Sequence, residues 1–472
     1  MIDLADIIID GNYQQLKHAV EMGMDVNEID KYGYTPLIET AIMRKTTMAK
    51  LLLSHGAIID EMDMAGRTAL HWAVDTNNLR LATLLLEAGA DPNSYGFSGE
   101  PVLVNPILRK QNRLKQLLYE FGGNLNFAQD FISHKLLAHR FALKGNGEII
   151  THKNQAIQIN YEGFFPEFTL ELIADSLSRF KHNYGGRHLR AFFKSLDYVI
   201  DALRIASSLT HYKHFTYDID RQMPQLAPLF KTEPLIIPIG YEGHAVAFIK
   251  LGDYFAKCDR GEAGKRFGTV TIYKIGNPRA FNKKFLKFIM YERQKKFFIE
   301  EGVNDLLSLE KFASLPLSLQ VAGNCSWANV EAVIPTLLFM LWLYHDQKPS
   351  EKEINHYADA AMFFFEEWQE WDQDRALDNI LHSYESANKA RRFTKVSILC
   401  AILFQHLDYT NAKDLRRAEK IIPYIIQPEH EFFLRTYIKL YHKRYHTDKG
   451  KKLMHLLELA GARFEDDNDL LN

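Results

Sequence analysis

Cysteine is scarce in this sequence, with three residues among 472. They are far apart and odd in number, which excludes a disulfide framework and favours a reducing compartment. The three are Cys258, Cys325 and Cys400. Each is expected to carry a free thiol.

An excess of charge of either sign is also missing, because 57 Lys and Arg residues nearly balance 59 Asp and Glu residues. A net charge of -2 provides no overall field that would draw the chain onto nucleic acid, so we expect no direct nucleic-acid binding. The most apolar run, 332–344, contains a proline and is shorter than the roughly 20 residues that a membrane-spanning helix needs. We expect it to form a buried core helix and the chain to have no transmembrane segment.

Motifs for metals and nucleotides are missing as well. No His-Glu-x-x-His pair occurs, the cysteines lack the spacing of a zinc site, and there is no P-loop. The first residues, 1–6, contain acids where a secretory signal has basic residues. We therefore expect no metal, no cofactor and no classical signal peptide.

A repeat of 33 residues runs through the N-terminal part of the chain. Glycines that begin its turns stand at Gly23, Gly56, Gly89 and Gly122, and a second set of landmarks with the same step begins at Gly33, Gly66 and Gly99. Thr35 and Thr68 can cap a first helix, and Pro36 suits the opening turn of such a helix. Leucine clusters then predict a second helix in each repeat.

This pattern resembles the ankyrin-repeat family over residues 1–140, as four repeats with a degenerate first and a worn fourth copy. The resemblance implies an α-solenoid whose hairpin tips and first helices form a concave face that binds another protein. Candidate contact residues at the tips are Tyr32, Tyr34, Met62, Met64, Arg67, Tyr95 and Phe97.

A second region, 145–348, begins where the repeat ends. Up to about residue 220 its apolar residues recur at steps of three and four, which predicts helices. From Pro234 onward, short runs rich in β-branched residues predict strands separated by short turns, at 235–239, 244–249, 254–259 and 269–275. We therefore expect an α+β domain with an antiparallel sheet.

Three residues of this region suggest thiol chemistry. His244 opens the second predicted strand and Asp259 closes the third, so antiparallel pairing brings both to the same end of the sheet. Cys325 stands near the start of the apolar helix, where the helix dipole and a nearby imidazolium both favour the nucleophilic thiolate. Cys325 is thus predicted to be the nucleophile, His244 its base and Asp259 the group that orients the imidazole. Gln320, with the backbone N–H of Cys325, is expected to stabilise an oxyanion.

The order His, Asp, Gln, Cys resembles the cysteine protease superfamily, especially the clan of ubiquitin-like-protein proteases, adenovirus-type proteases and bacterial effector acetyltransferases. The sequence of a glutamine, then the cysteine, then a tryptophan before a helix also resembles papain. In both families the glutamine usually precedes the cysteine by six residues, whereas here the step is five. The alternative interpretation is that Cys325 is a small core residue and His244 a structural strand residue. The other two cysteines are expected in the core.

The remaining region, 349–472, is predicted to be a helical domain. As a whole the chain resembles translocated ankyrin-repeat effectors of bacteria that carry a cysteine-protease-like domain. The resemblance implies delivery by a specialised secretion system into the cytoplasm or nucleus of a host cell. There the repeats would bind a host protein and the thiol site would hydrolyse a peptide or isopeptide bond, for example in a ubiquitin-like substrate, or transfer an acyl group. The alternative is a non-enzymatic scaffold that modulates a host protein complex.

Overall fold

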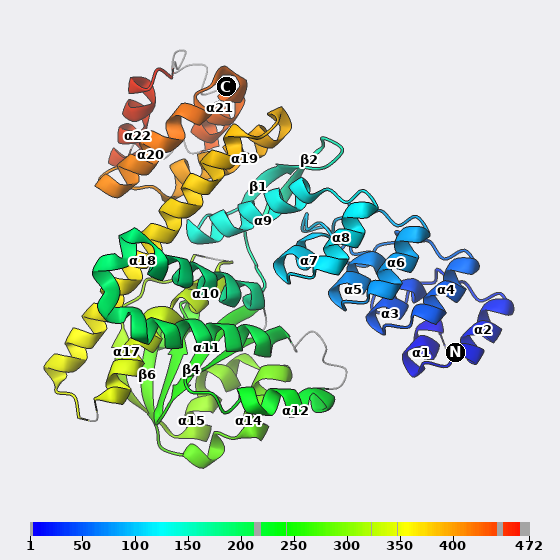
Figure 1. The fold of residues 1–472 in the computed structure, drawn as a ribbon, viewed down its shortest axis with the longest axis horizontal. Helices are drawn as coiled ribbons and strands as arrows, with labels where there is room; N and C mark the ends of the chain where they lie inside the picture. The colour runs from blue at the N-terminus through cyan, green and yellow to red at the C-terminus, as the bar shows by residue number, and fades with distance from the viewer. Residues whose placement is uncertain are drawn as a thin grey trace.

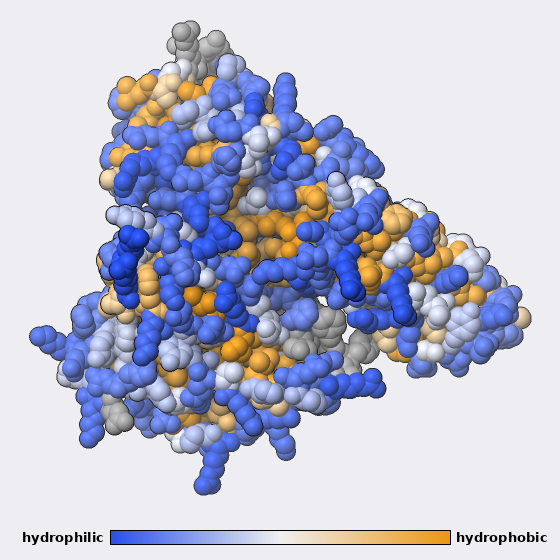
Figure 2. All heavy atoms as spheres, in the orientation of Figure 1, coloured by the Kyte–Doolittle hydropathy of each residue, from blue (hydrophilic) through white to orange (hydrophobic). Residues whose placement is uncertain are grey.

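The computed structural model describes residues 3–211, 219–241, 243–321, 323–346, 348–440 and 447–462. An elongated arm of N-terminal helices extends to the right, the part that contains the main sheet lies at the lower left, and the C-terminal helices lie above it (Figure 1). Hydrophobic side chains gather in the hollow between the arm and the C-terminal helices, on a face that is otherwise largely hydrophilic (Figure 2).

The arm is a stack of helix pairs that follows the 33-residue repeat. Thr35 caps its helix as predicted, since the hydroxyl accepts a hydrogen bond from the N–H of Ile38 at 3.2 Å, and Pro36 occupies the first turn. The pairs are α1 (Leu4–Asp10) and α2 (Tyr13–Glu21), α3 (Pro36–Ile42) and α4 (Thr46–Ser54), α5 (Ala69–Asp75) and α6 (Leu79–Glu87), and α7 (Val104–Leu108) and α8 (Asn112–Glu120).

Asparagine side chains join neighbouring repeats. The amide of Asn93 accepts a hydrogen bond from the backbone N–H of Asn124 at 2.7 Å and donates one to the carbonyl of Gly122 at 2.9 Å. Asn27 makes the equivalent two bonds to the second repeat, at 2.8 and 3.2 Å. Each asparagine therefore satisfies backbone groups of the next turn, which helps to set the stacking distance.

Helix α9 (Leu125–Arg140) connects the arm to the rest of the chain, and a hairpin of β1 (Asn146–Ile150) and β2 (Ala156–Asn160) follows it. The sequence predicted helices from residue 145 to about 220, so the hairpin is a correction. Ile149 and Ile159 are fully buried between more exposed neighbours, the alternation of a half-buried strand. The predicted helices begin only after it, as α10 (Pro166–His182), the 3-10 segment η1 (Tyr184–Phe192), α11 (Phe193–His211) and α12 (Ile219–Leu229).

The main sheet is antiparallel and contains, within the described residues, five strands in the order β3-β4-β5-β6-β7. Four of them coincide with the predicted strands, and β7 was not predicted. Its sequence, Leu-Glu-Lys-Phe-Ala-Ser-Leu, lacks β-branched residues, and as an edge strand it buries little. The strands are β3 (Leu235–Tyr241), β4 (His244–Leu251), β5 (Tyr254–Cys258), β6 (Val270–Ile275) and β7 (Leu309–Leu315).

Helices cover both faces of this sheet. One face, with Ile236, Ile249 and Ile272, packs on α10, α11, α16 (Cys325–Glu331) and α17 (Val333–His345). The other face, with Ile237 and Phe248, packs on α12, α14 (Lys283–Tyr291) and α15 (Val303–Leu307). The segment Cys325–His345 is long and apolar enough to cross a membrane, but 94% of its most apolar window is buried here. The apolar run is therefore a buried core helix, as predicted.

Shorter segments complete the central part: α13 (Glu262–Phe267), η3 (Pro278–Ala280) and η4 (Phe298–Gly302). The C-terminal region is helical as predicted. Its elements are α18 (Glu351–Glu385), α19 (Lys389–Ala401), η5 (Ile402–His406), α20 (Ala412–Ile425), η6 (Pro428–His430), α21 (Glu431–Leu440) and α22 (Asp448–Leu459).

Helix α18 belongs to two hydrophobic cores. Its first half places Phe364 and Trp368 in the core beneath the sheet, and its second half places Leu377 and Ile380 in the core of the C-terminal helices. The domain boundaries at 140/145 and 348/349 stay predictions, but the second of them lies just before a helix that both parts share.

Candidate thiol site

Three of the predicted site residues lie together at one end of the sheet. Strands β4 and β5 pair antiparallel, with Ala247 opposite Cys258, so the start of β4 meets the end of β5. His244 is the first residue of β4 and Asp259 directly follows β5. The imidazole Nε2 of His244 and Oδ1 of Asp259 are 2.9 Å apart. Cys325, the first residue of α16, contributes the thiol.

The Cys325 sulfur lies against the backbone on either side of His244. The N–H of Ala245 donates to Sγ at 3.4 Å, and the carbonyl oxygen of Gly243 lies 4.0 Å from the same sulfur. An N–H donor stabilises a negatively charged sulfur, as the first turn of α16 also does. The thiol is partly exposed, whereas the other two cysteines are buried as predicted.

The electrostatics favour an ion pair between thiolate and imidazolium. Burial raises the pKa of Cys325, but hydrogen bonding with His244 and with the N–H groups of Ala245 and Ser326 outweighs burial and lowers it. Burial lowers the pKa of His244, but hydrogen bonding with Asp259 and Cys325, together with their charges, raises it to about 9. Both changes increase the population of the charged pair near neutral pH.

The Asp259 carboxylate determines which imidazole nitrogen is left for the thiol. Because Nε2 of His244 is hydrogen-bonded to the carboxylate, Nδ1 is the ring nitrogen left to interact with the thiol. The carboxylate is itself held by the backbone N–H of Gly261 at 2.9 Å. A Cβ at position 261 would lie 2.7 Å from Cε1 of His244, so a side chain there would displace the imidazole. Sequence reasoning did not identify Gly261 as a site residue.

Asn329 is a further positioning residue that sequence reasoning missed. It lies one helical turn after Cys325, is buried, and donates from Nδ2 to the carbonyl of Ala245 at 2.6 Å. Its Oδ1 accepts a hydrogen bond from the N–H of Arg260 at 2.7 Å. The side chain therefore fastens α16 to β4 and to the segment after β5, which positions the His–Asp pair relative to the thiol. The signal in the sequence was that Asn329 follows Cys325 by four residues, which places both on the same face of a helix.

Gln320 lies beside Asn329 rather than in the cleft. Its backbone N–H donates to the carbonyl of Arg260 at 2.8 Å, and its Oε1 accepts from Nδ2 of Asn329 at 3.5 Å. Among the residues that the structure describes, Gln320 does not line the cleft at the thiol. Its role at an oxyanion stays a prediction.

A cleft of about 540 Å³ opens at the thiol. Cys325 and His244 line it, as does the segment between α14 and η4. Its other lining residues include Phe164, Pro166, Tyr241, Tyr291, Arg293 and Gln294. Mixed aromatic and polar walls suit an extended peptide. Across the described ranges, no group of three or more His, Cys, Asp or Glu residues could hold a metal ion.

The candidate partner-binding residues of the arm fall into two groups. Exposed side chains at the hairpin tips are Tyr32, Met62, Met64 and Phe97. The others make internal contacts: Tyr34 packs edge-on against Trp72 at 5.8 Å, Tyr95 packs against Phe127 at 5.7 Å, and Arg67 pairs with Asp75. Partner binding by any of these residues stays a prediction.

Replacing Asp259 with Asn should lower the pKa of His244 from about 9 by roughly 1 to 3 pH units, and raise the pKa of Cys325. The amide preserves the shape of the side chain but removes the charge that favours imidazolium. His244 would therefore lose its proton at lower pH. NMR titration of the imidazole C–H signals measures this change. Asp253→Asn, in the exposed turn at the other end of β4, is the control, and an unchanged His244 pKa in Asp259→Asn would contradict the assignment.

Known proteins resemble this chain both in its repeats and over nearly its whole length. The family model for ankyrin repeats matches residues 4–95 in three copies, so the α7–α8 pair lies beyond the matched range. No curated protein matches the chain. Among solved structures, the chain is similar to one described as the structure of the Legionella effector AnkH, with a TM-score of 0.85 and 39% sequence identity. The match covers 99% of both chains.

Proposed function

The chain belongs to the family of the Legionella effector AnkH, and from that premise we propose that it is a host-directed thiol hydrolase. A specialised secretion system delivers it into the host cell, to the cytoplasm or nucleus. The ankyrin repeats hold a host protein, and Cys325 attacks a peptide or isopeptide bond in that protein or in one associated with it.

The observation that carries this proposal is the local geometry at Cys325. A partly exposed thiol with a lowered pKa lies beside an imidazole whose pKa is raised to about 9, and that imidazole is held by a carboxylate at 2.9 Å. The other two thiols are fully buried and have raised pKa values. Perturbation in opposite senses within one cleft is typical of an activated nucleophile rather than of a core cysteine.

The reaction follows from these groups. The Cys325 thiolate adds to the carbonyl carbon of the bond, and N–H groups at the start of α16 stabilise the oxyanion. The imidazolium of His244 gives its proton to the leaving amine, which leaves a thioester on Cys325. Water, deprotonated by His244, then hydrolyses the thioester to a carboxylic acid and regenerates the thiolate. If an amine enters instead of water, the same thioester transfers its acyl group to that amine.

Turnover of defined amide substrates tests the proposal. Ubiquitin-like proteins with a fluorogenic amide at the C-terminus, and short fluorogenic peptides, should release fluorophore. Cys325→Ala should reduce the rate by about 10³-fold or more, because the nucleophile is lost. Circular dichroism should show an unchanged fold. Failure to release fluorophore from any substrate, combined with no acyl transfer from acetyl-coenzyme A to lysine peptides, would contradict the enzymatic proposal.

The second candidate is a non-enzymatic scaffold, which is favoured by the exposed apolar side chains at the hairpin tips. Met64 is 82% exposed and Phe97 is 74% exposed, and large exposed apolar residues on a repeat surface often mark a protein interface. A scaffold would keep its partner and its cellular effect in Cys325→Ala, whereas a hydrolase would keep only the partner.

A further inference from the structure

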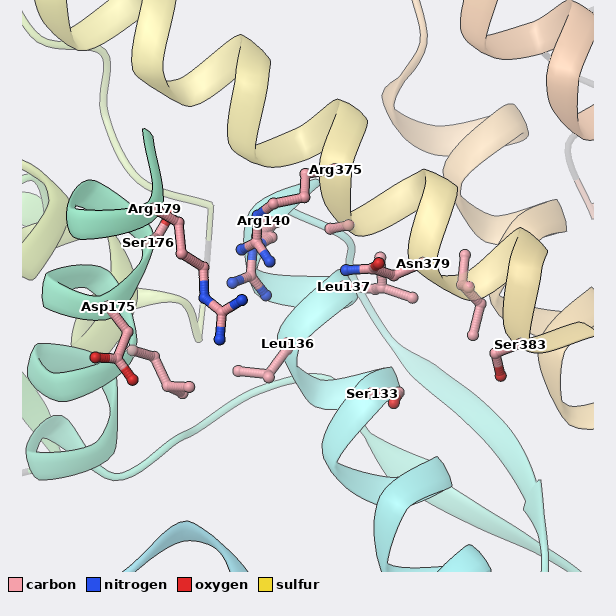
Figure 3. Close-up of a pocket in the computed structure, with 13 residues that line it drawn as sticks. Ser133, Leu136, Leu137, Arg140, Asp175, Ser176, Arg179, Arg375, Asn379 and Ser383 are labelled. Carbon is pink, nitrogen blue, oxygen red and sulfur yellow. The ribbon is translucent and has the colours of Figure 1, made fainter. Parts of the chain in front are cut away.

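A second pocket lies where helices α9, α10 and α18 meet (Figure 3). Within the described residues it shares no lining residue with the thiol cleft. Three arginines reach it from three different helices: Arg140 from the end of α9, Arg179 from α10 and Arg375 from α18. Figure 3 shows their guanidinium groups directed toward the same region of the pocket.

The positive charge of this cluster is only partly balanced. One buried carboxylate, Asp372, pairs with Nε of Arg140 and with Nη2 of Arg375, each at 2.5 Å. Asp175 also lines the pocket, but it pairs with Lys110 and Arg204 on another side, and its carboxylate points away from the arginines in Figure 3. Two of the three guanidinium groups therefore share a single carboxylate.

Some guanidinium N–H donors of this cluster also have no acceptor among the described residues. Nε of Arg375 is buried and has no acceptor among the described residues. The Arg179 side chain is exposed, points toward the other two guanidinium groups, and makes no hydrogen bond or ion pair with any part of the chain that the structure describes. Like charges repel and buried unsatisfied donors are costly, so this arrangement favours an anion that would accept several hydrogen bonds at once.

The other residues that line the pocket indicate which chemical group is attached to the anion. Leu136, Leu137, Leu172 and Ile380 form an apolar wall, and Ser133, Asn379 and Ser383 add polar groups. The cavity volume is about 370 Å³, which exceeds the size of a lone phosphate. Arg179 is exposed, but the Arg140 and Arg375 side chains are only 8% and 28% exposed, so a flat lipid bilayer would not contact all three guanidinium groups.

We propose that this pocket binds a small phosphorylated organic molecule. Its phosphate lies among Arg140, Arg179 and Arg375, and its organic part contacts the leucine wall. Three guanidinium groups that approach from three directions suit the tetrahedral oxygens of a phosphate better than the two oxygens of a carboxylate.

Isothermal titration of the full chain with pyrophosphate, adenosine 5′-monophosphate and adenosine tests the proposal. The two anions should bind, and adenosine should bind at least about tenfold more weakly than its monophosphate, because only the phosphate meets the arginines. Arg179→Ala should weaken binding of the anions about tenfold or more. This substitution removes no hydrogen bond or ion pair within the described residues and lies at an exposed side chain, so the fold should persist.

Arg113→Ala, at an exposed arginine on α8 of the arm, is the matched control and should leave binding unchanged. Binding of either anion that falls in Arg179→Ala but not in Arg113→Ala supports the proposal. Absence of binding by both anions, or equal weakening by the two substitutions, overturns it. Capture by vesicles that contain phosphatidylinositol phosphates, with no binding of either soluble anion, would also overturn it, because the site would then be a membrane surface.

Discussion

Iodoacetamide should alkylate Cys325 in the folded chain at pH 7 on the order of 100-fold faster than Cys258 or Cys400. Burial raises the pKa of Cys258 to about 12, so only on the order of 10⁻⁵ of that thiol is ionised at pH 7. Burial raises the pKa of Cys400 as well. Cys325 has a lowered pKa and is partly exposed. Mass spectrometry of the three cysteine peptides over time gives the three rates.

Removal of the imidazole identifies the cause of this reactivity. His244→Ala should slow alkylation of Cys325 by about tenfold or more at pH 7, because the thiol pKa rises once its cationic partner is gone. His382→Ala, at an exposed histidine on α18, is the matched control and should have no effect. Equal rates at all three cysteines, or a Cys325 rate that His244→Ala leaves unchanged, would show that the thiol is not activated.

Asp130→Ala should lower the free energy of unfolding by about 3 to 5 kcal/mol. The Asp130 carboxylate on α9 binds Nε and Nη2 of Arg391 at 2.7 and 2.8 Å, and Nζ of Lys395 at 3.0 Å, both on α19. The Asp130 and Lys395 side chains are only 3% and 2% exposed. Without the carboxylate, an ammonium group would stay buried without its counter-charge. Urea unfolding followed by circular dichroism measures the loss.

The control for this substitution is Asp378→Ala. Asp378 pairs with Lys420 at 2.6 Å, but both side chains are about half exposed, so its loss should change stability by less than about 1 kcal/mol. Restoring an apolar partner in Asp130→Ala/Lys395→Met should recover part of the loss. An Asp130→Ala variant as stable as Asp378→Ala would contradict the role of this buried pair in joining α9 to α19.

The same carboxylate makes stability depend on pH. Burial raises the pKa of Asp130, but hydrogen bonds and charges from Arg391 and Lys395 outweigh burial and lower it below its ordinary value. The folded pKa is thus below the unfolded one, so the contribution of Asp130 is fully present above the unfolded pKa, near 4. It is lost as pH falls through the folded pKa. Asp130→Ala should accordingly lose less stability than the parent chain on acidification below pH 4.

The features that could be predicted from the sequence are those with a local period or a single pairing rule. Thr35 and Pro36 mark a helix start through contacts within four residues, and the 33-residue repeat copies that signal along the arm. His244 and Asp259 could be placed together because short turns leave adjacent strands little choice of pairing. Cys325 could be placed at a helix start because the apolar run follows directly.

The features that could not be predicted depend on contacts between distant segments. Asn329 reaches a carbonyl 84 residues away, and Asp130 reaches Lys395 across 265 residues. No local pattern reveals such pairs in a single sequence. Strand β7 was missed because it has no β-branched residue and little burial of its own, and only its pairing with β6 defines it as a strand. Arg140, Arg179 and Arg375 are likewise unremarkable until the three helices that carry them meet.

Helix α18 couples the unfolding of the sheet region to the unfolding of the C-terminal helices. Trp368 and Ile380 lie on one continuous helix but in different cores. Unfolding of either core would therefore destabilise the helix that the other core needs. The sheet region and the C-terminal helices would then denature in a single cooperative step, and a truncation after residue 385 would weaken the thiol cleft from afar. The arm, whose repeats touch mainly their neighbours, could fray from its free tip without such a consequence.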